Sequence, residues 1–215
     1  MDKHFLIALV VVVLGLFGLF YFSRDNNPNT GTSSNGQTSN HTEGNNTKHV
    51  ELLVYGDFEC SACEQIFPIE KQAVEKYYND ISFTFRHFAL DGTHPNARAA
   101  ARSAEAAGLQ GKFFEMHNLL YQEQNSWVRL SNPYPVFEQM AKTLGLETSK
   151  FKTDYASEAV NKTINADYQA GVKQGVDGTP TYFLNGEKLN NQDILSVAKF
   201  SVLIDKAIQD SSKSN

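Results

Sequence analysis

The chain has very few cysteines and little positive charge. Cys60 and Cys63 are its only two cysteines among 215 residues, and 19 Lys and Arg face 24 Asp and Glu, which gives a net charge of −5. Nucleic-acid binding needs a basic face, so we expect no such partner. Two thiolates fall short of the four ligands of a structural zinc site, and no H-x3–5-H pair follows them. We therefore expect no metal.

Long uncharged runs are also scarce, with one exception near the start. Residues 5–22, FLIALVVVVLGLFGLFYF, carry no charge and would span roughly 27 Å as a helix, close to the thickness of a bilayer core. The run is longer than the apolar part of a typical signal peptide and ends in a poor cleavage site. We predict a short cytoplasmic segment at 1–4 and an uncleaved transmembrane anchor at 5–22.

The next segment, residues 23–48, is rich in Asn, Ser, Thr and Gly and has no large apolar residue. Such a composition does not bury enough apolar surface to offset the entropy lost on ordering. We therefore predict a flexible tether at 23–48, followed by one folded domain at 49–215.

The folded part opens with a pattern typical of a βαβ unit. Residues 50–56 (VELLVYG) and 81–88 (ISFTFRHF) are expected strands, and a helix with apolar residues at helical spacing is expected between them at 61–78. A helical crossover makes such strands parallel. Pro68 is expected to bend the helix.

Helical patterns dominate the middle of the chain, and strand character returns only at 181–189, where Asn185-Gly186 predicts a hairpin turn. The sum is a small α/β sheet with flanking helices, interrupted by an all-helical insertion. The expected helices are 96–107, 112–124, 132–144, 149–157, 159–173 and 192–208.

The two cysteines form a C-x-x-C pair placed just after a strand and at the start of a helix. A structural clip over so short a loop would contribute only about 2 kcal/mol. Free N–H groups at a helix start favour a thiolate at Cys60, and Cys63, one turn further, is placed to resolve a mixed disulfide. A redox pair is therefore favoured over a structural disulfide or a metal site.

Three segments together resemble the thioredoxin superfamily, and specifically its membrane-tethered DsbA-like thiol:disulfide oxidoreductases. They are VYGDFECSACEQIFP (54–68), FRHFALDGTHPNARAAARSAEAAGLQGKFFEMHNLLYQEQNSW (85–127) and GVDGTPTYFLNG (175–186). The resemblance implies a thioredoxin core at 49–93 and 176–215 with a helical insertion at 94–175. It also implies that Thr179 precedes a cis-proline, Pro180, and that both bind the substrate peptide beside the cysteines.

The resemblance implies an enzyme outside the cytoplasm, anchored with its N-terminus inside. It would donate a Cys60–Cys63 disulfide to reduced or unfolded exported proteins and be reoxidised by a membrane partner with its own cysteines. No cofactor beyond that disulfide is expected. The alternatives are a disulfide reductase or isomerase of the same fold, or a non-catalytic thioredoxin-like binding module with a structural disulfide.

Two departures from the family pattern concern the tuning of the cysteines. Val54 occupies a position where many relatives carry a buried acid, and Asp57 is better explained as a turn cap at the strand end. Ser61 and Ala62, the redox-tuning pair between the cysteines, include no His, and Glu59 would disfavour a thiolate at its neighbour. We therefore expect a less extreme oxidant.

Three histidines, His87, His94 and His117, attract attention, but structural roles are favoured for each. His87 ends a strand, His94 precedes a proline at a helix start, and His117 lies on an amphipathic helix.

Overall fold

The computed structural model describes residues 36–213, so the predicted anchor at 5–22 lies outside the described residues. Within 36–213, no helix combines the length and apolar character needed to cross a membrane. The elements in chain order are β1 (His41–Glu43), β2 (Val50–Gly56), α2 (Ser61–Lys76), β3 (Ile81–His87), α3 (Ala97–Gly108), α4 (Phe113–Gln122), α5 (Gln124–Trp127), α6 (Tyr134–Thr143), α7 (Thr148–Tyr155), α8 (Glu158–Lys173), β4 (Thr181–Leu184), β5 (Glu187–Lys188), the 3-10 turn η1 (Asn191–Ile194) and α9 (Val197–Lys213).

The strands form a single five-stranded sheet in the order β1-β3-β2-β4-β5. The expected parallel pairing of β2 and β3 is confirmed, with Gly56 opposite His87, while the other pairs are antiparallel. Because β2 and β3 run in the same direction, both end at the same edge of the sheet. The residues that follow Gly56 and His87 are therefore neighbours in space.

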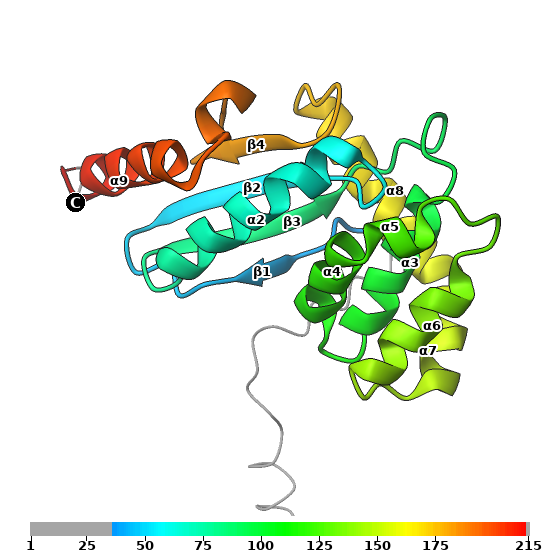
Figure 1. The fold of residues 1–215 in the computed structure, drawn as a ribbon. Helices are drawn as coiled ribbons and strands as arrows, with labels where there is room; N and C mark the ends of the chain where they lie inside the picture. Colours follow the sequence, from blue (N-terminus) through cyan, green and yellow to red (C-terminus); the bar gives the residue numbers. More distant parts are fainter. Residues whose placement is uncertain (1–35, 214–215) are drawn as a thin grey trace, which may run out of the picture.

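Side chains on β2 alternate between two apolar layers. Val50, Leu52 and Val54 belong to the main core with α2 and α9, whereas Leu53 and Tyr55 belong to a smaller cluster on the other face of the sheet. Figure 1 shows α2 crossing the front of the sheet and α8 passing behind it. The strand is buried on both faces, which explains its nearly continuous apolar sequence.

The helices α3–α7, residues 97–155, gather at one end of the sheet and are called the helical lobe here (Figure 1). Their core contains Trp127, Phe137 and Phe151, none of which is exposed. The following helix, α8, returns to the sheet, because Tyr168 stacks on Phe88 with ring centroids 4.5 Å apart. The segment between β3 and β4 is therefore helical as expected, and its last helix covers the second face of the sheet.

The two turns around β4 and α9 follow from local residues. Asn185 (φ 49°) and Gly186 (φ 82°) have the left-handed conformation that a two-residue hairpin turn requires, which confirms the hairpin prediction. The last helix differs from its prediction, since it is split into η1 and α9. Ser196 accepts hydrogen bonds from the backbone N–H groups of Lys199 and Phe200, so it caps a new helix start at that point.

The tether prediction is wrong for residues 36–48. His41–Glu43 pairs with β3 as an edge strand, and the Thr42 and Thr84 hydroxyl groups lie 2.8 Å apart. The Ser39 backbone N–H donates to Asp167 Oδ1 at 2.8 Å. The composition misled because the side chains that this segment buries are polar, and hydrogen bonds from distant parts of the chain stabilise them in place of apolar contacts.

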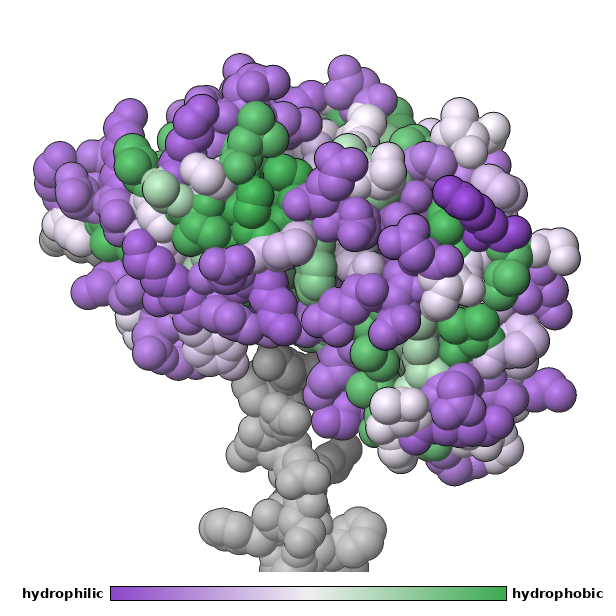
Figure 2. Space-filling view, viewed as in Figure 1, coloured by the Kyte–Doolittle hydropathy of each residue, from purple (hydrophilic) through white to green (hydrophobic). Residues whose placement is uncertain are grey.

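The face shown in Figure 2 is mostly hydrophilic, with apolar side chains gathered near the β4 side of the sheet and on the helical lobe. Among the large apolar residues, Val202 of α9 is 66% exposed, Leu195 49% and Leu130 42%. Tyr78 and Val172 are exposed to a similar degree, at 44% and 48%.

Candidate functional site

The site is built where β2 gives way to α2. Cys60 has an extended backbone (φ −68°, ψ 122°) and occupies the N-cap position of the helix, with its N–H donating to the Asp57 carbonyl at 3.1 Å. Asp57 Oδ1 accepts the Glu59 N–H at 2.8 Å and Oδ2 accepts the Leu90 N–H at 2.9 Å. The expectation that Asp57 caps a turn at the strand end is thereby confirmed.

Two loops that are far apart in sequence meet at the cysteines. The Thr179–Pro180 peptide bond is cis, as the resemblance implies, and the Thr179 carbonyl oxygen lies 3.4 Å from Cys60 Sγ. Cys60 is 8% exposed and Cys63 4%, whereas Ser61 and Ala62 are exposed in the first turn of α2. The fold thus brings together Cys60, Cys63 and the cis-proline loop, and directs the pair between the cysteines to solvent.

The two cysteines are electrostatically unlike. A hydrogen bond from the Cys63 thiol lowers the pKa of Cys60 to about 5, against the opposing effect of burial, with help from the Thr179 side chain and the free N–H groups of the helix start. Burial raises the pKa of Cys63 well above its ordinary value. At neutral pH the outer sulfur is therefore a thiolate and the inner sulfur a thiol, the arrangement that nucleophilic attack followed by resolution requires.

A protonatable imidazole stands next to this loop. His94 Nδ1 lies 2.7 Å from Asp57 Oδ2, and its side chain is 24% exposed. Burial alone would lower the pKa of His94, but the hydrogen bond and charge of Asp57 raise it, and the charge of Cys60 adds to this effect. Sequence reasoning placed His94 at a helix start and missed this contact, because it depends on the fold of the 88–96 loop.

A buried acid lies on α2, two turns beyond Cys63. Val54 pairs with Tyr182 across the sheet, and the Tyr182 hydroxyl donates to Glu70 Oε2 at 2.6 Å. Burial raises the pKa of Glu70 to about 7. Its sequence signal was available, since Glu70 falls on the buried face of α2 with Cys63, Ile66 and Phe67.

One buried side-chain amide of the helical lobe, that of Gln124, holds the loop that carries Cys60. Gln124 Nε2 donates to the Phe58 carbonyl at 2.8 Å and to the Cys60 carbonyl at 3.2 Å. Glu59 extends in the same direction and accepts the Asn96 N–H at the start of α3, at 2.5 Å. Both residues were missed as supports, because neither contact can be deduced from local sequence.

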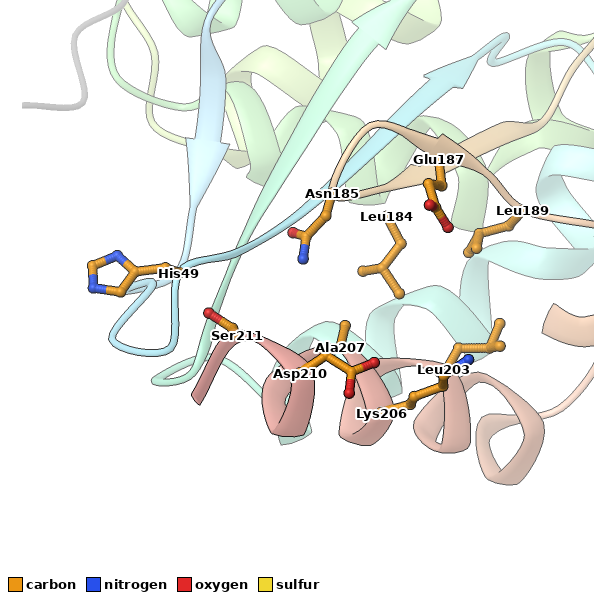
Figure 3. A pocket seen from close by; sticks show the side chains of 10 residues that line it. All are labelled: His49, Leu184, Asn185, Glu187, Leu189, Leu203, Lys206, Ala207, Asp210 and Ser211. Atoms are coloured by element: carbon orange, nitrogen blue, oxygen red, sulfur yellow. The ribbon is translucent and has the colours of Figure 1, made fainter. Parts of the chain in front are cut away.

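A cavity of about 520 Å³ between the β4–β5 hairpin and α9 is a separate feature (Figure 3). Leu184, Asn185 and Glu187 line it from the hairpin, and Leu203 and Lys206 from the helix. It lies at the end of β4 remote from Thr179, so it is not part of the cysteine site.

The family model described as Thioredoxin matches residues 37–206. The chain belongs to the thioredoxin family. The match begins before β1, which agrees with the inclusion of that strand in the folded domain.

Solved structures of DsbA-like proteins share the fold of this thioredoxin-family chain. BdbD from Bacillus subtilis is 19% identical, with a TM-score of 0.69 over 82% of this chain and 98% of that one. Wolbachia pipientis alpha-DsbA1 is 20% identical, with a TM-score of 0.70 over 81% and 94%. MdbA of Actinomyces oris, a thiol-disulfide oxidoreductase, is 16% identical, with a TM-score of 0.66 over 80% and 92%.

Curated relatives are larger proteins. The Na(+)/H(+) antiporter NhaA 1 of Salinispora arenicola is 35% identical over 148 residues, which cover 69% of this chain and 22% of the relative. NhaA 3 of Salinispora tropica is 34% identical over 164 residues, covering 75% and 24%. The chain spans about a quarter of the length of these relatives, and their names describe the whole proteins.

Proposed function

We propose that this chain is an extracytoplasmic thiol:disulfide oxidoreductase that donates a Cys60–Cys63 disulfide to exported proteins. The observation that carries the proposal is the unequal pair at the start of α2. Cys60 has a pKa of about 5 and faces the cis-proline loop, while Cys63 is buried behind it with a raised pKa. A structural disulfide needs no such division between its two sulfurs.

In the proposed reaction, a substrate thiolate attacks Cys60 Sγ of the disulfide. The Cys60–Cys63 bond breaks, a mixed disulfide forms, and the Cys63 sulfur leaves with the electron pair and takes up a proton. A second substrate thiolate then attacks the substrate sulfur of the mixed disulfide and expels Cys60 as a stabilised thiolate. The substrate loses two electrons and two protons, and the cysteine pair gains two electrons.

The backbone of the cis-proline loop is suited to hold the substrate during this exchange. Thr179 and Pro180 precede β4, and the Thr179 carbonyl lies within contact of the attacked sulfur. We propose that an extended substrate segment pairs with this backbone, which accounts for a broad range of exported substrates because main-chain groups are common to all of them.

After each turnover Cys60 and Cys63 are left reduced, so an oxidant must restore their disulfide to complete the cycle. We propose a membrane partner with its own cysteines, which takes the two electrons through a further disulfide exchange. Residues 5–22 would anchor the chain with the folded domain on the extracytoplasmic side. An alkaline phosphatase fused after Arg24, ahead of the folded domain, should be active in a bacterial host, and an inactive fusion would contradict this topology.

Alkylation tests the proposed chemistry directly. Reduced protein treated with iodoacetamide at pH 6 should be modified at Cys60 within minutes, since most of that sulfur is then a thiolate. Cys63 should remain unmodified. A non-catalytic module with a structural disulfide would react slowly at both cysteines. A reductase or isomerase would pass this test, so oxidation of a dithiol peptide by the disulfide form must also be followed.

A further inference from the structure

A second cluster of reactive side chains lies at the adjacent strand end, away from the cysteines. His41 of β1, His87 of β3 and Glu105 of α3 meet there, with His41 Nε2 2.6 Å and His87 Nε2 2.8 Å from the same carboxylate oxygen, Oε1. Their exposed fractions are 7%, 1% and 5%. Three elements that are separated in sequence therefore direct one donor atom each to a single point.

The surrounding residues fix these side chains in place. The His41 ring stacks on Phe113 with an interplanar angle of 7°. The His87 backbone N–H donates to Asp167 Oδ2 at 3.1 Å, and the Ser39 hydroxyl donates to the same oxygen at 2.5 Å. A second carboxylate thus lies next to the cluster, which raises the negative charge that a bound cation would balance.

The donor set selects a class of metal ion. Two imidazole nitrogens and one carboxylate oxygen suit Zn²⁺ and neighbouring transition metals, whereas Mg²⁺ and Ca²⁺ take oxygen ligands almost exclusively. Within residues 36–213, His41, His87 and Glu105 are the group of His, Cys, Asp or Glu side chains whose donor atoms all lie within 4.8 Å of one another.

The geometry fits such an ion after a small adjustment. Zinc lies about 2.0–2.2 Å from imidazole nitrogen and carboxylate oxygen, so tetrahedral donors are roughly 3.4 Å apart. The two short contacts would open by roughly 0.7 Å on that basis. Without metal, each imidazole must donate its Nε2–H to the carboxylate, which only accepts. A divalent ion would take the place of the two hydrogens at Nε2, and each neutral ring would then carry its N–H at Nδ1.

We propose that His41, His87 and Glu105 bind one transition-metal ion of the Zn²⁺ class, with water as the fourth ligand. The ion fastens β1 to β3 and to the helical lobe. β1 has only three residues and is an edge strand, so it gains most from such a link. This proposal departs from the sequence-based expectation of no metal, which considered only the cysteines as the centre of a site.

The test uses the full chain in detergent, without a histidine tag, in a Cys60→Ser/Cys63→Ser background that removes the thiolates as competing ligands. After chelator treatment, Co²⁺ is titrated and the visible d–d absorption of tetrahedral Co²⁺ is recorded. We expect saturation at one equivalent, displacement by Zn²⁺, and a melting temperature that rises with either ion. Absence of binding to this parent protein would overturn the proposal and leave the cluster as a metal-free ion pair network.

Substitutions locate the ion. His41→Gln should abolish the absorption and the rise in melting temperature, and His87→Gln should do the same. His49→Gln is the matched control, because His49 is an exposed histidine eight residues further along and outside the cluster. Equal binding by parent and His41→Gln, or loss of binding in the His49→Gln control, would place the ion elsewhere and refute the assignment.

Discussion

The parallel strands β2 and β3 end side by side, yet the two strand ends carry sites of opposite character. After Gly56 the chain enters a helix start whose N–H groups favour an anion, and Cys60 Sγ lies 3.4 Å from the Thr179 carbonyl of the cis-proline loop. After His87 the neighbouring site is covered by α3 and by β1, and His87 is 1% exposed. Both sites are nearly closed to solvent, since Cys60 is 8% and His41 7% exposed. They differ in chemistry, because the first favours an anionic sulfur and the second gathers two imidazoles around one carboxylate.

The largest effect should follow from removing the sulfur of Cys60. Cys60→Ser should abolish oxidation of a dithiol peptide and the capture of mixed disulfides, because the attacked atom is gone. Cys63→Ser, the matched variant at the buried sulfur, should instead accumulate mixed disulfides that nothing resolves. Oxidation is followed with the reduced dithiol peptide, and capture is followed on non-reducing gels with a disulfide-bonded peptide, whose S–S bond the Cys60 thiolate of the Cys63→Ser variant attacks. The reverse pattern would show that the roles of the two cysteines are exchanged.

A large effect on stability, and little on chemistry, is expected at the other strand end. Glu105→Gln replaces the carboxylate that accepts from both histidines by a neutral amide, and each hydrogen bond to a charged group contributes about 1.5–3 kcal/mol. We expect a loss of about 3 kcal/mol in the free energy of unfolding, measured in urea with chelator present. The alkylation rate of Cys60 should be unchanged. A slower rate in folded protein would show that the two strand ends are coupled.

Glu70, buried on α2, tests how the stability of the core responds to pH. Its pKa is about 7 in the folded chain and about 4.5 when unfolded, so the folded state binds the proton more tightly and stability falls as pH rises from about 4.5 to 7. The loss is about 3 kcal/mol by that linkage. Glu70→Gln cannot ionise and should lose about 2.5 kcal/mol less stability between pH 5 and pH 8, measured by urea unfolding of the oxidised protein. Parallel curves for both proteins would contradict the buried position of the acid.

The smallest expected effect concerns the exposed pair between the cysteines. A Cys60 pKa of about 5 lies between thioredoxin's value near 7 and DsbA's near 3.5, so we expect a reduction potential between roughly −270 and −120 mV. Ala62→His should raise the potential, because an imidazolium there stabilises the thiolate, and Ala62→Gln is the neutral control. Equilibration with glutathione at pH 7 measures all three. An equal shift in the Gln variant would exclude the charge as the cause.

Local pattern was a good guide where short-range physics decides the structure. The β2 and β3 strands, the helix from Ser61 and the Asn185-Gly186 turn were all predicted, because apolar periodicity and left-handed turn residues act over a few positions. The resemblance added the cis peptide bond at Pro180. The assignment of substrate binding to Thr179 and Pro180 stays a prediction.

Contacts between distant residues were beyond local pattern. Gln124 holds the Cys60 loop from 64 residues away, and His94 reaches Asp57 from a loop with no periodicity. Glu105 left a weak trace, as a single acid in a run of buried alanines. The partners of such a residue can be named only once the tertiary structure shows what its helix packs against.

The sequence by itself determined the α/β class, the order of the elements from β2 to β4 and the position of the cysteine pair at a helix start, because these depend on composition and near-neighbour spacing. Tertiary structure alone decided that the polar segment around His41 is an ordered edge strand, since its partners at Glu105 and Asp167 lie 64 and 128 residues away from His41 and Ser39. It likewise decided the low pKa of Cys60, because the Cys63 thiol and the Thr179 loop lower that pKa, against the opposing effect of burial, only once the chain has folded.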